Sequence, residues 1–349
     1  MGGNPGAIER QAGVQRWRGL AESAPDWDRT VVTIGVFDGV HRGHRALIDA
    51  TVREATSLQP VPAPYPGGPG ERPRVVVVTF DPHPAAVLRP ASAPDMLTTI
   101  DHRAVLIEGL AADGLDIDGL CTLPFTPELA LLSPAEFVRT VLVEHLRAAA
   151  VVVGEGFRFG HRAEGDVDLL RTLGADWGFA VHTVTLLADP EGLVSSSRIR
   201  TDVADGDVEA AAAALGRPHR VEGVVVRGDQ RGRELGFPTA NLSSPPRTAV
   251  PADGVYAGWL IRTPAKTAAD QETPLPATIS VGTNPTFAGE RARRVEAFVL
   301  DFDGDLYDAE VAVDFASRLR PTVAFDSVEA LIIQMDADVA EVRRLLLGG

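Results

Sequence analysis

The sequence predicts an α/β protein: a doubly wound parallel sheet in the N-terminal part, followed by a small antiparallel β-barrel with a closing helix. Two observations lead to this fold class. Through about residue 200, apolar β-branched runs alternate with amphipathic helical segments, which is typical of a parallel sheet covered by helices. From Val221 onward the apolar runs are short and separated by turn residues, which favours an antiparallel barrel. The length of 349 residues is sufficient for two domains.

The N-terminal part alternates strand-like and helix-like segments. RVVVVTF is almost entirely β-branched, as expected of a parallel strand buried on both faces. Ser133 and Pro134 are a typical N-cap and first residue of a helix. The proline-rich and glycine-rich residues 59–70 predict an exposed loop. We expect strands at 30–37, 74–80, 117–125, 148–154 and 179–187, and helices at 44–58, 101–114, 133–146 and 166–178.

The C-terminal part has the pattern of the barrel. Residues 202–216 predict one helix, capped by Asp202 or Asp205 and ended by Gly216 and Pro218. We therefore expect domains at 14–203 and 204–349. The strands of the barrel are expected in the segments 221–228, 254–262, 277–282, 293–302 and 309–319, and the closing amphipathic helix at 327–347.

Composition and charge exclude several classes of protein. A formal net charge of −15 disfavours non-specific binding to nucleic acid or to anionic membranes. The single cysteine, Cys121, excludes an intramolecular disulfide and a cysteine-based zinc site. No secretory signal, myristoylation motif or membrane span is recognisable. We expect a cytoplasmic protein without nucleic-acid or membrane partners.

The segment TIGVFDGVHRGH at 33–44 ends the first strand and opens a helix. Ligands of open parallel sheets bind beyond the carboxyl ends of the strands, and a helix N-terminus favours phosphate. His41 and His44 lie three residues apart, on one face of the first helical turn. Both can donate to a phosphate group whose charge grows when a nucleophile attacks the α-phosphorus of ATP. The whole pattern resembles the HxGH signature of nucleotidyltransferases.

Two further segments of the N-terminal part supply groups that suit phosphate oxygens. GEGFRFGHRAEGD at 154–166 contains Arg158, and VSSSRIR at 194–200 contains Ser196, Ser197 and Arg200. Each is a weak signal by itself, because an isolated arginine is more often an ordinary surface residue.

The C-terminal part contains a second candidate site. GDQRGRELGFPTANL at 228–242 offers Gly232 and Gly236, which let the backbone wrap around phosphate. Thr239 and Asn241 supply hard oxygen ligands that suit Mg²⁺ bound to ATP. Glu296 alternates with buried positions of a strand. It either faces solvent or acts as a general base on a substrate hydroxyl.

Taken together, these motifs resemble the bacterial bifunctional FAD synthetases, which combine a riboflavin kinase with an FMN adenylyltransferase. The resemblance covers the chain from about Val14 to its end. It depends on a highly specific set of motifs in the family's order: GVFDGVHRGH, TFDPHP, FRFG, SSSRIR, RGRELGFPTANL, PADGVY, GTNPTF and DFDGDLY.

The resemblance implies two ATP-dependent reactions on small-molecule ligands: riboflavin, FMN, FAD and ATP. The domain at 14–203 would transfer AMP from ATP to FMN, with His41 and His44 on the ATP phosphates. The domain at 204–349 would phosphorylate riboflavin, with Thr239 and Asn241 at the Mg²⁺–ATP site and Glu296 as base. The nucleotide sites implied by the motifs comprise Gly35, Phe37, Asp38, Gly39, Arg158, Ser196, Ser197, Arg200, Gly232 and Gly236. The oligomeric state stays open.

The sequence departs from the family pattern at four residues, and these departures leave alternatives open. Gly156 stands where the family usually has Asn or Asp, Ser197 where it usually has Thr, and Phe298 where it often has His. Asp308 also replaces a common Gly. One alternative is a riboflavin kinase with a weakened adenylyltransferase, and another is a non-catalytic flavin-binding regulator.

Overall fold

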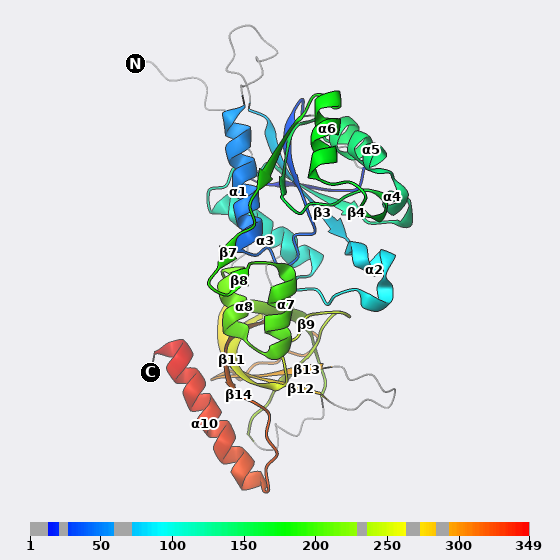
Figure 1. Ribbon diagram of the computed structural model, residues 1–349. Helices are drawn as coiled ribbons and strands as arrows, with labels where there is room; N and C mark the ends of the chain where they lie inside the picture. The colour runs from blue at the N-terminus through cyan, green and yellow to red at the C-terminus, as the bar shows by residue number, and fades with distance from the viewer. Residues whose placement is uncertain are drawn as a thin grey trace, which may run out of the picture. The chain divides into compact units, whose positions relative to one another are not determined.

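The computed structural model describes residues 13–20, 27–58, 72–228, 236–262, 273–283 and 293–348. Two compact units interleave along the chain (Figure 1). The sheet unit comprises the stretches Met1–Val36, Leu47–Leu88 and Ile107–Thr185, and the barrel unit comprises Phe37–Ala46, Arg89–Leu106 and Leu186–Gly349. No helix in the described part of the chain is both long enough and apolar enough to span a membrane. The loop expected at 59–70 lies outside the described residues.

The sheet unit contains a six-stranded parallel sheet in the order β1-β4-β3-β2-β5-β6, as predicted. The strand order reverses between β2 and β5, which is where open sheets of this kind bind ligands. The edge strand β1 was not expected from the sequence, because Trp17 is its one buried residue. The strands are β1 (Gln15–Arg18), β2 (Thr30–Ile34), β3 (Arg74–Asp81), β4 (Gly119–Pro124), β5 (Ala148–Gly154) and β6 (Ala180–Val184).

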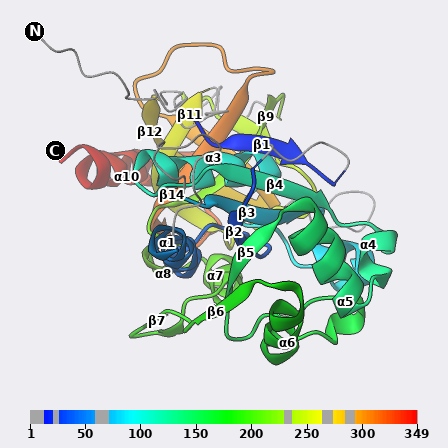
Figure 2. The same cartoon turned by 90° about the horizontal axis from the view of Figure 1, so that it is seen from above.

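Alternate residues of the central strands pack on opposite faces of this sheet. Val31 belongs to one core, together with Ala55 of α1, whereas Val32 belongs to another, together with Leu170 of α6. Figure 2 shows α1 on one side of the sheet and α5 and α6 on the other. This arrangement confirms the doubly wound fold. The helices are α1 (Arg42–Ser57), α2 (Pro84–Leu88), α3 (Ile100–Ala112), α4 (Pro127–Leu131), α5 (Pro134–Phe137) and α6 (Val167–Trp177), with the short helix η3 (His161–Ala163). The short helix η1 (Pro90–Ser92) and the first residues of α1 and α3 belong to the barrel unit.

The helix expected at 133–146 begins as predicted and then changes type. Ser133 caps α5, its hydroxyl accepting from the Glu136 amide while the Glu136 carboxylate accepts from the Ser133 amide. From Val138 to His145 the backbone continues as a π-helix, η2. The sequence predicted the N-cap at Ser133 but not the π-helix that follows.

The barrel unit contains a closed antiparallel barrel in the order β10-β13-β12-β11-β14-β9, which confirms the second predicted architecture. Its interior is filled by apolar residues from every strand, among them Val221, Leu260 and Ile279. Two short strands, β7 (Ala188–Asp189) and β8 (Gly192–Leu193), form a separate hairpin. The barrel strands are β9 (His219–Val226), β10 (Ala240–Ser243), β11 (Gly254–Arg262), β12 (Pro274–Thr283), β13 (Arg293–Val299) and β14 (Glu310–Arg320).

The expectation of a single helix at 202–216 is wrong. The structure has two helices there, α7 (Ser196–Asp205) and α8 (Val208–Leu215). Gly206 adopts a left-handed conformation (φ 80°) that ends α7, and the Asp207 carboxylate accepts from the Ala210 amide to begin α8. The sequence analysis missed this break between the two helices because the following alanine-rich segment favours a continuous helix.

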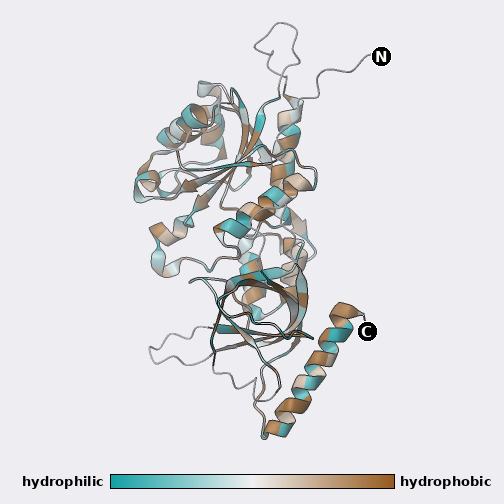
Figure 3. Cartoon of the chain, turned by 180° about the vertical axis from the view of Figure 1, so that it is seen from behind, coloured by the Kyte–Doolittle hydropathy of each residue, from teal (hydrophilic) through white to brown (hydrophobic). Residues whose placement is uncertain are grey.

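The closing helix α10 (Val328–Leu347) follows the barrel, and Ser327 caps its N-terminus. Figure 3 shows polar and apolar residues mixed along its length. Asp338 is buried and accepts from the guanidinium of Arg320 on β14 at 2.7–3.2 Å. Val342 packs against Leu300 and Ala257 of the barrel. A second ion pair joins Arg343 of the helix to Asp301 at 2.6–2.7 Å. In the described residues, two ion pairs and a small apolar contact therefore hold α10.

Candidate functional sites

The segment between β2 and α1 is a strained turn rather than a simple continuation of the strand. β2 ends at Ile34, and the amide of Gly35 donates to Val78 O at 3.0 Å within the sheet unit. In the barrel unit, Phe37, Gly39 and Val40 have φ values of 52°, 84° and 40°. A β-branched residue at positive φ is a rare outlier, and such positions persist only where surrounding contacts hold them.

The buried carboxylate of Asp38 is the centre of these contacts. It accepts from the amides of Leu97 and Thr98 at 3.0–3.1 Å and from the Thr98 hydroxyl at 3.1 Å. The Thr98 hydroxyl also accepts from the Gly39 amide at 3.2 Å. Asp38 therefore fixes the turn to residues 97–98.

Two arginines neutralise this carboxylate. Arg200 Nη2 donates to Asp38 at 2.6 Å, and Arg103 Nη2 lies 3.7 Å from it. Arg200 Nε also donates to Asp95 O at 2.7 Å. Ser196 donates to Asp38 O at 2.8 Å. The structure thus brings together the predicted residues Asp38, Ser196 and Arg200, with serine and arginine supporting the turn.

His41 and His44 stack face to face, with ring centroids 3.5 Å apart and planes inclined by 17°. The His41 amide donates to Nδ1 of His44 at 3.3 Å, and the His44 amide donates to Nδ1 of His41 at 3.2 Å. Since Nδ1 accepts in each ring, the proton of each neutral imidazole lies on Nε2. Phe37 is buried and packs edge-on against His44 at 5.1 Å.

Both imidazoles are neutral at physiological pH. Burial lowers the pKa of His41 to about 4, against a weaker opposite effect of Asp38, and neighbouring arginines lower it further. Burial also lowers the pKa of His44 well below its usual value, and His41 adds to this shift. The pair therefore presents two N–H donors without positive charge, next to the N-terminus of α1.

The remaining predicted residues of the N-terminal part lie elsewhere. Arg158 is exposed in the sheet unit and lies 3.7 Å from Asp166. Gly156 is also exposed, and a Cβ there would meet no atom within 4 Å. Ser197 is exposed on the first turn of α7, in the barrel unit. The described contacts do not join Arg158 or Ser197 to the histidine pair.

The three predicted kinase residues gather on one face of the barrel. Asn241 of β10 pairs directly with Glu296 of β13, while Val295 and Ala297 point into the apolar interior. The Thr239 hydroxyl lies 3.5 Å from the Glu296 carboxylate, and the Asn241 side chain donates to Thr239 O at 3.4 Å. Glu296 is half-buried. These contacts are long, so the side chains are only loosely held.

A cavity of about 480 Å³ adjoins this face. Thr239 and Asn241 line it, together with the Arg227 guanidinium, which lies 5.5 Å from the centre of the Tyr307 ring. Glu296 is not among the described residues of its wall. Gly236 has a φ of 87°, a conformation that favours glycine, whereas Gly232 lies outside the described residues. The volume is typical of a small-molecule site.

The donor set of this face fits Mg²⁺ that is bound mainly through phosphates. Thr239, Asn241 and Glu296 offer hydroxyl, amide and carboxylate oxygens, which are hard ligands. Within the described residues, no group of three or more His, Cys, Asp or Glu side chains is arranged to hold a metal. A magnesium ion here would be held by oxygens of Thr239 and Asn241 together with the phosphates of a nucleotide.

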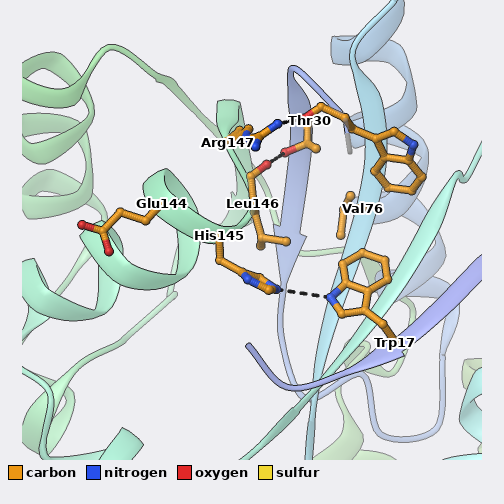
Figure 4. Close-up of a pocket in the computed structure, with 8 residues that line it drawn as sticks. Trp17, Thr30, Val76, Glu144, His145, Leu146 and Arg147 are labelled. Carbon is orange, nitrogen blue, oxygen red and sulfur yellow. Dashed lines mark hydrogen bonds between the residues drawn. The ribbon is translucent and has the colours of Figure 1, made fainter. Parts of the chain in front are cut away.

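A second cavity, of about 190 Å³, lies in the sheet unit (Figure 4). The indole N–H of Trp17 donates to His145 Nε2 at 3.4 Å, and Thr30 donates to Leu146 O at 2.6 Å. Thr30 begins β2 and Ala148 begins β5. This cavity is at the amino ends of the strands, opposite the end where such sheets bind ligands, so it is not a candidate active site.

Sequence reasoning missed several residues that shape the histidine turn. Thr98, Arg103 and Arg217 all contact residues 38–40 within the barrel unit. Their partners lie between 59 and 178 positions away along the chain, so no local sequence pattern predicts these contacts. A buried aspartate in a glycine-rich turn was the one available signal, because a buried charge requires partners.

Comparisons with known proteins match both parts of the chain to families. The riboflavin kinase family model matches residues 215–346, and the FAD synthetase family model matches residues 23–198. The bifunctional riboflavin kinase/FMN adenylyltransferase of Pseudomonas fluorescens is 37% identical over 95% of this chain and 98% of its own length. The protein of the same name from Escherichia coli K12 is 35% identical, over 88% and 90%.

A solved structure matches nearly the whole chain. The crystal structure of a protein named macrolide-efflux protein from Streptococcus pneumoniae has a TM-score of 0.78 and 31% identity. The match covers 95% of this chain and 99% of that one. Two family models in the expected order, and full-length relatives above 30% identity, lead to one conclusion: this chain belongs to the family of bifunctional riboflavin kinase/FMN adenylyltransferases.

Proposed function

We propose that this enzyme phosphorylates riboflavin with ATP to give FMN and then transfers AMP from a second ATP to FMN, giving FAD and pyrophosphate. The observation that carries the proposal is the stacked pair of neutral imidazoles on a turn held by a buried carboxylate. Such donors suit a phosphate whose negative charge grows during reaction. Membership of the family supports both reactions.

In the adenylyl transfer, a phosphate oxygen of FMN attacks the α-phosphorus of ATP, and the bond to pyrophosphate breaks. His41 and His44 donate from Nε2 to the phosphate oxygens on which charge accumulates. Because the rings are neutral, they need not lose a proton to act, and no covalent intermediate is required. The amide groups at the N-terminus of α1 add further donors.

In the kinase reaction, Glu296 accepts the proton of the ribityl 5′-hydroxyl as that oxygen attacks the γ-phosphorus of ATP, and ADP leaves. Thr239 and Asn241 orient the nucleotide on the same face of the barrel. Mg²⁺, when bound, offsets the negative charge of the phosphates. The carboxylate of Glu296 lies next to Asn241 on this face, which suits Glu296 to the role of general base.

The proposal assigns adenylyl transfer to residues 14–203 and riboflavin phosphorylation to residues 204–349. The matches of the two family models, 23–198 and 215–346, support a division between them. We also place the protein in the cytoplasm. Its single cysteine, Cys121, is a buried thiol, as suits a reducing compartment.

Chromatography of the reaction products tests the proposal. Purified protein with riboflavin, ATP and Mg²⁺ should yield FMN first and FAD later, and with FMN as the starting substrate it should yield FAD and pyrophosphate. Removal of the metal with EDTA should stop FMN formation. If neither FMN nor FAD forms, the proposed function is wrong. If flavin binds tightly without turnover, the protein is a binding protein.

A further inference from the structure

Arg217 contacts the histidine turn although it lies far from the turn in sequence. Its Nη2 donates to Gly39 O at 2.7 Å, and its Nη1 donates to Val40 O at 3.5 Å. Burial lowers its pKa to about 10, so it remains charged at neutral pH. All these residues belong to the barrel unit. One guanidinium therefore joins the two carbonyls that immediately precede His41.

The place of Arg217 in the chain makes this contact unexpected. Gly216 ends α8 in a left-handed conformation, and β9 of the barrel begins at His219. Arg217 thus stands in the short connection between them. It lies within the match of the riboflavin kinase family model and outside that of the FAD synthetase model. A residue of the kinase part therefore holds the turn of the adenylyltransferase part.

The turn needs such an anchor because its backbone is strained. Val40 at φ 40° and Gly39 at φ 84° are the two residues whose carbonyls accept from Arg217. A β-branched residue such as Val40 is strained at a positive φ and is retained there only when surrounding contacts fix it. The carboxylate of Asp38 holds one side of the turn, through its hydrogen bonds to the amides of Leu97 and Thr98. Arg217 holds the carbonyl side, directly before the catalytic histidines, mainly through its 2.7 Å bond to Gly39 O, and its contact with Val40 O is longer, at 3.5 Å.

We propose that Arg217 is a positioning residue for adenylyl transfer, which acts by holding Gly39 and Val40 so that His41 and His44 meet the reacting phosphate. This inference rests on the proposed function. Small displacements of catalytic groups cost up to about 10²-fold in rate. Loss of Arg217 should therefore lower the kcat for FAD formation and leave riboflavin phosphorylation in the same chain nearly unchanged.

The test uses the full-length protein with Arg217→Met, which removes both donors, and Arg217→Lys, which keeps the charge but cannot span both carbonyls. Arg247→Met is the matched control, because Arg247 also donates to two carbonyls within the barrel unit, those of Ala93 and Pro90. For Arg217→Met we expect kcat for FAD formation to fall at least tenfold, with KM for FMN and ATP within about threefold. The kcat of Arg217→Lys for FAD formation should lie between that of Arg217→Met and that of the unaltered protein.

The kinase rate serves as an internal measure of folding. The inference is wrong if Arg217→Met keeps kcat for FAD formation within twofold, if it loses both reactions equally, or if Arg247→Met loses FAD formation as severely. Should Arg217→Met fail to fold, the same comparison is made with Arg217→Lys. If the unaltered protein forms no FAD at all, the failure belongs to the proposed function and not to Arg217.

Discussion

The two candidate sites differ in how firmly their groups are held. At the histidine turn, a buried carboxylate accepts hydrogen bonds of 2.6–3.1 Å, and each imidazole is fixed by a backbone amide. On the barrel face, Thr239, Asn241 and Glu296 are joined only by contacts of 3.4–3.5 Å. The histidine turn is therefore held firmly by the protein's own contacts, whereas the side chains on the barrel face are held loosely.

This difference matches the chemistry of the two reactions. Donors that stabilise developing charge are most effective when they are already oriented, because no free energy is then spent on reorganisation during the reaction. A general base that receives a proton needs access to the hydroxyl and to solvent, and it tightens its contacts in the complex with substrate. Variants at the two sites should therefore have separate effects.

The largest effect is expected for His44→Ala. Loss of one preorganised donor should lower FAD formation from FMN about 10²- to 10³-fold. Riboflavin phosphorylation should stay within about twofold, because Glu296, Thr239 and Asn241 are untouched. Separate assays with riboflavin and with FMN measure this. His182→Ala, which changes a half-exposed histidine paired with Glu54, is the control. Equal loss of both reactions in folded protein would contradict two independent sites.

Glu296→Gln is the reciprocal variant. An amide keeps the size of the side chain but cannot accept the proton, so FMN formation should fall about 10²-fold. FAD formation from supplied FMN should remain within twofold. Glu329→Gln, at an exposed position in the first turn of α10, controls for loss of a negative charge. Should Glu296→Gln phosphorylate riboflavin at the normal rate, Glu296 is an ordinary residue of the outer barrel face.

The buried histidines give the barrel unit a dependence on pH. Burial lowers the pKa of His219 to about 4, and His102 is shifted in the same direction, as are His41 and His44. The unfolded chain, with an ordinary histidine pKa near 6.5, binds more protons below that pH than the folded chain does. The free energy of unfolding should therefore fall as the pH drops from about 6.5 toward 4.

Urea unfolding at pH 7 and pH 5 measures this loss. Between pH 7 and pH 5, His219 alone should lower the free energy of unfolding by about 2 kcal/mol. The variant His219→Gln lacks this contribution, so its free energy of unfolding should fall by about 2 kcal/mol less than that of the unaltered protein. The free energy of unfolding of His219→Gln at pH 7 should also be lower than that of the unaltered protein, because the substitution removes the hydrogen bond between His219 Nε2 and Ala249 O. An identical pH dependence in both proteins would show that His219 is not neutral in the folded state.

Local sequence patterns predicted most of the fold, because caps and buried strands leave local signals. The N-cap at Ser133 and the apolar β3 are examples. The same reasoning missed β1, whose one buried residue is Trp17, and the break at Gly206 within an alanine-rich segment. The histidine pair was predicted from its spacing.

The supports of that pair could not be predicted. Leu97 and Thr98 reach Asp38 through backbone amides, which any residue type provides, and Arg217 contacts a turn 178 positions away. Arg200 was singled out from its motif, but the motif does not reveal that its Nε donates to Asp95 O and its Nη2 to the Asp38 carboxylate. Such contacts depend on how distant segments pack, and no local pattern encodes them.

The smallest effect is expected for Gly156→Asn, which restores a residue typical of the family. A Cβ at Gly156 meets no atom within 4 Å, and its φ is not in the left-handed region, so the variant should fold without strain. The histidine turn has its supports without residue 156, and we expect FAD formation to change less than about threefold. Gly109→Asn, at a position that is equally open and also outside the left-handed region, is the control for an added amide. An increase of tenfold or more in Gly156→Asn alone would mean that the adenylyltransferase lacks a group that the turn does not replace.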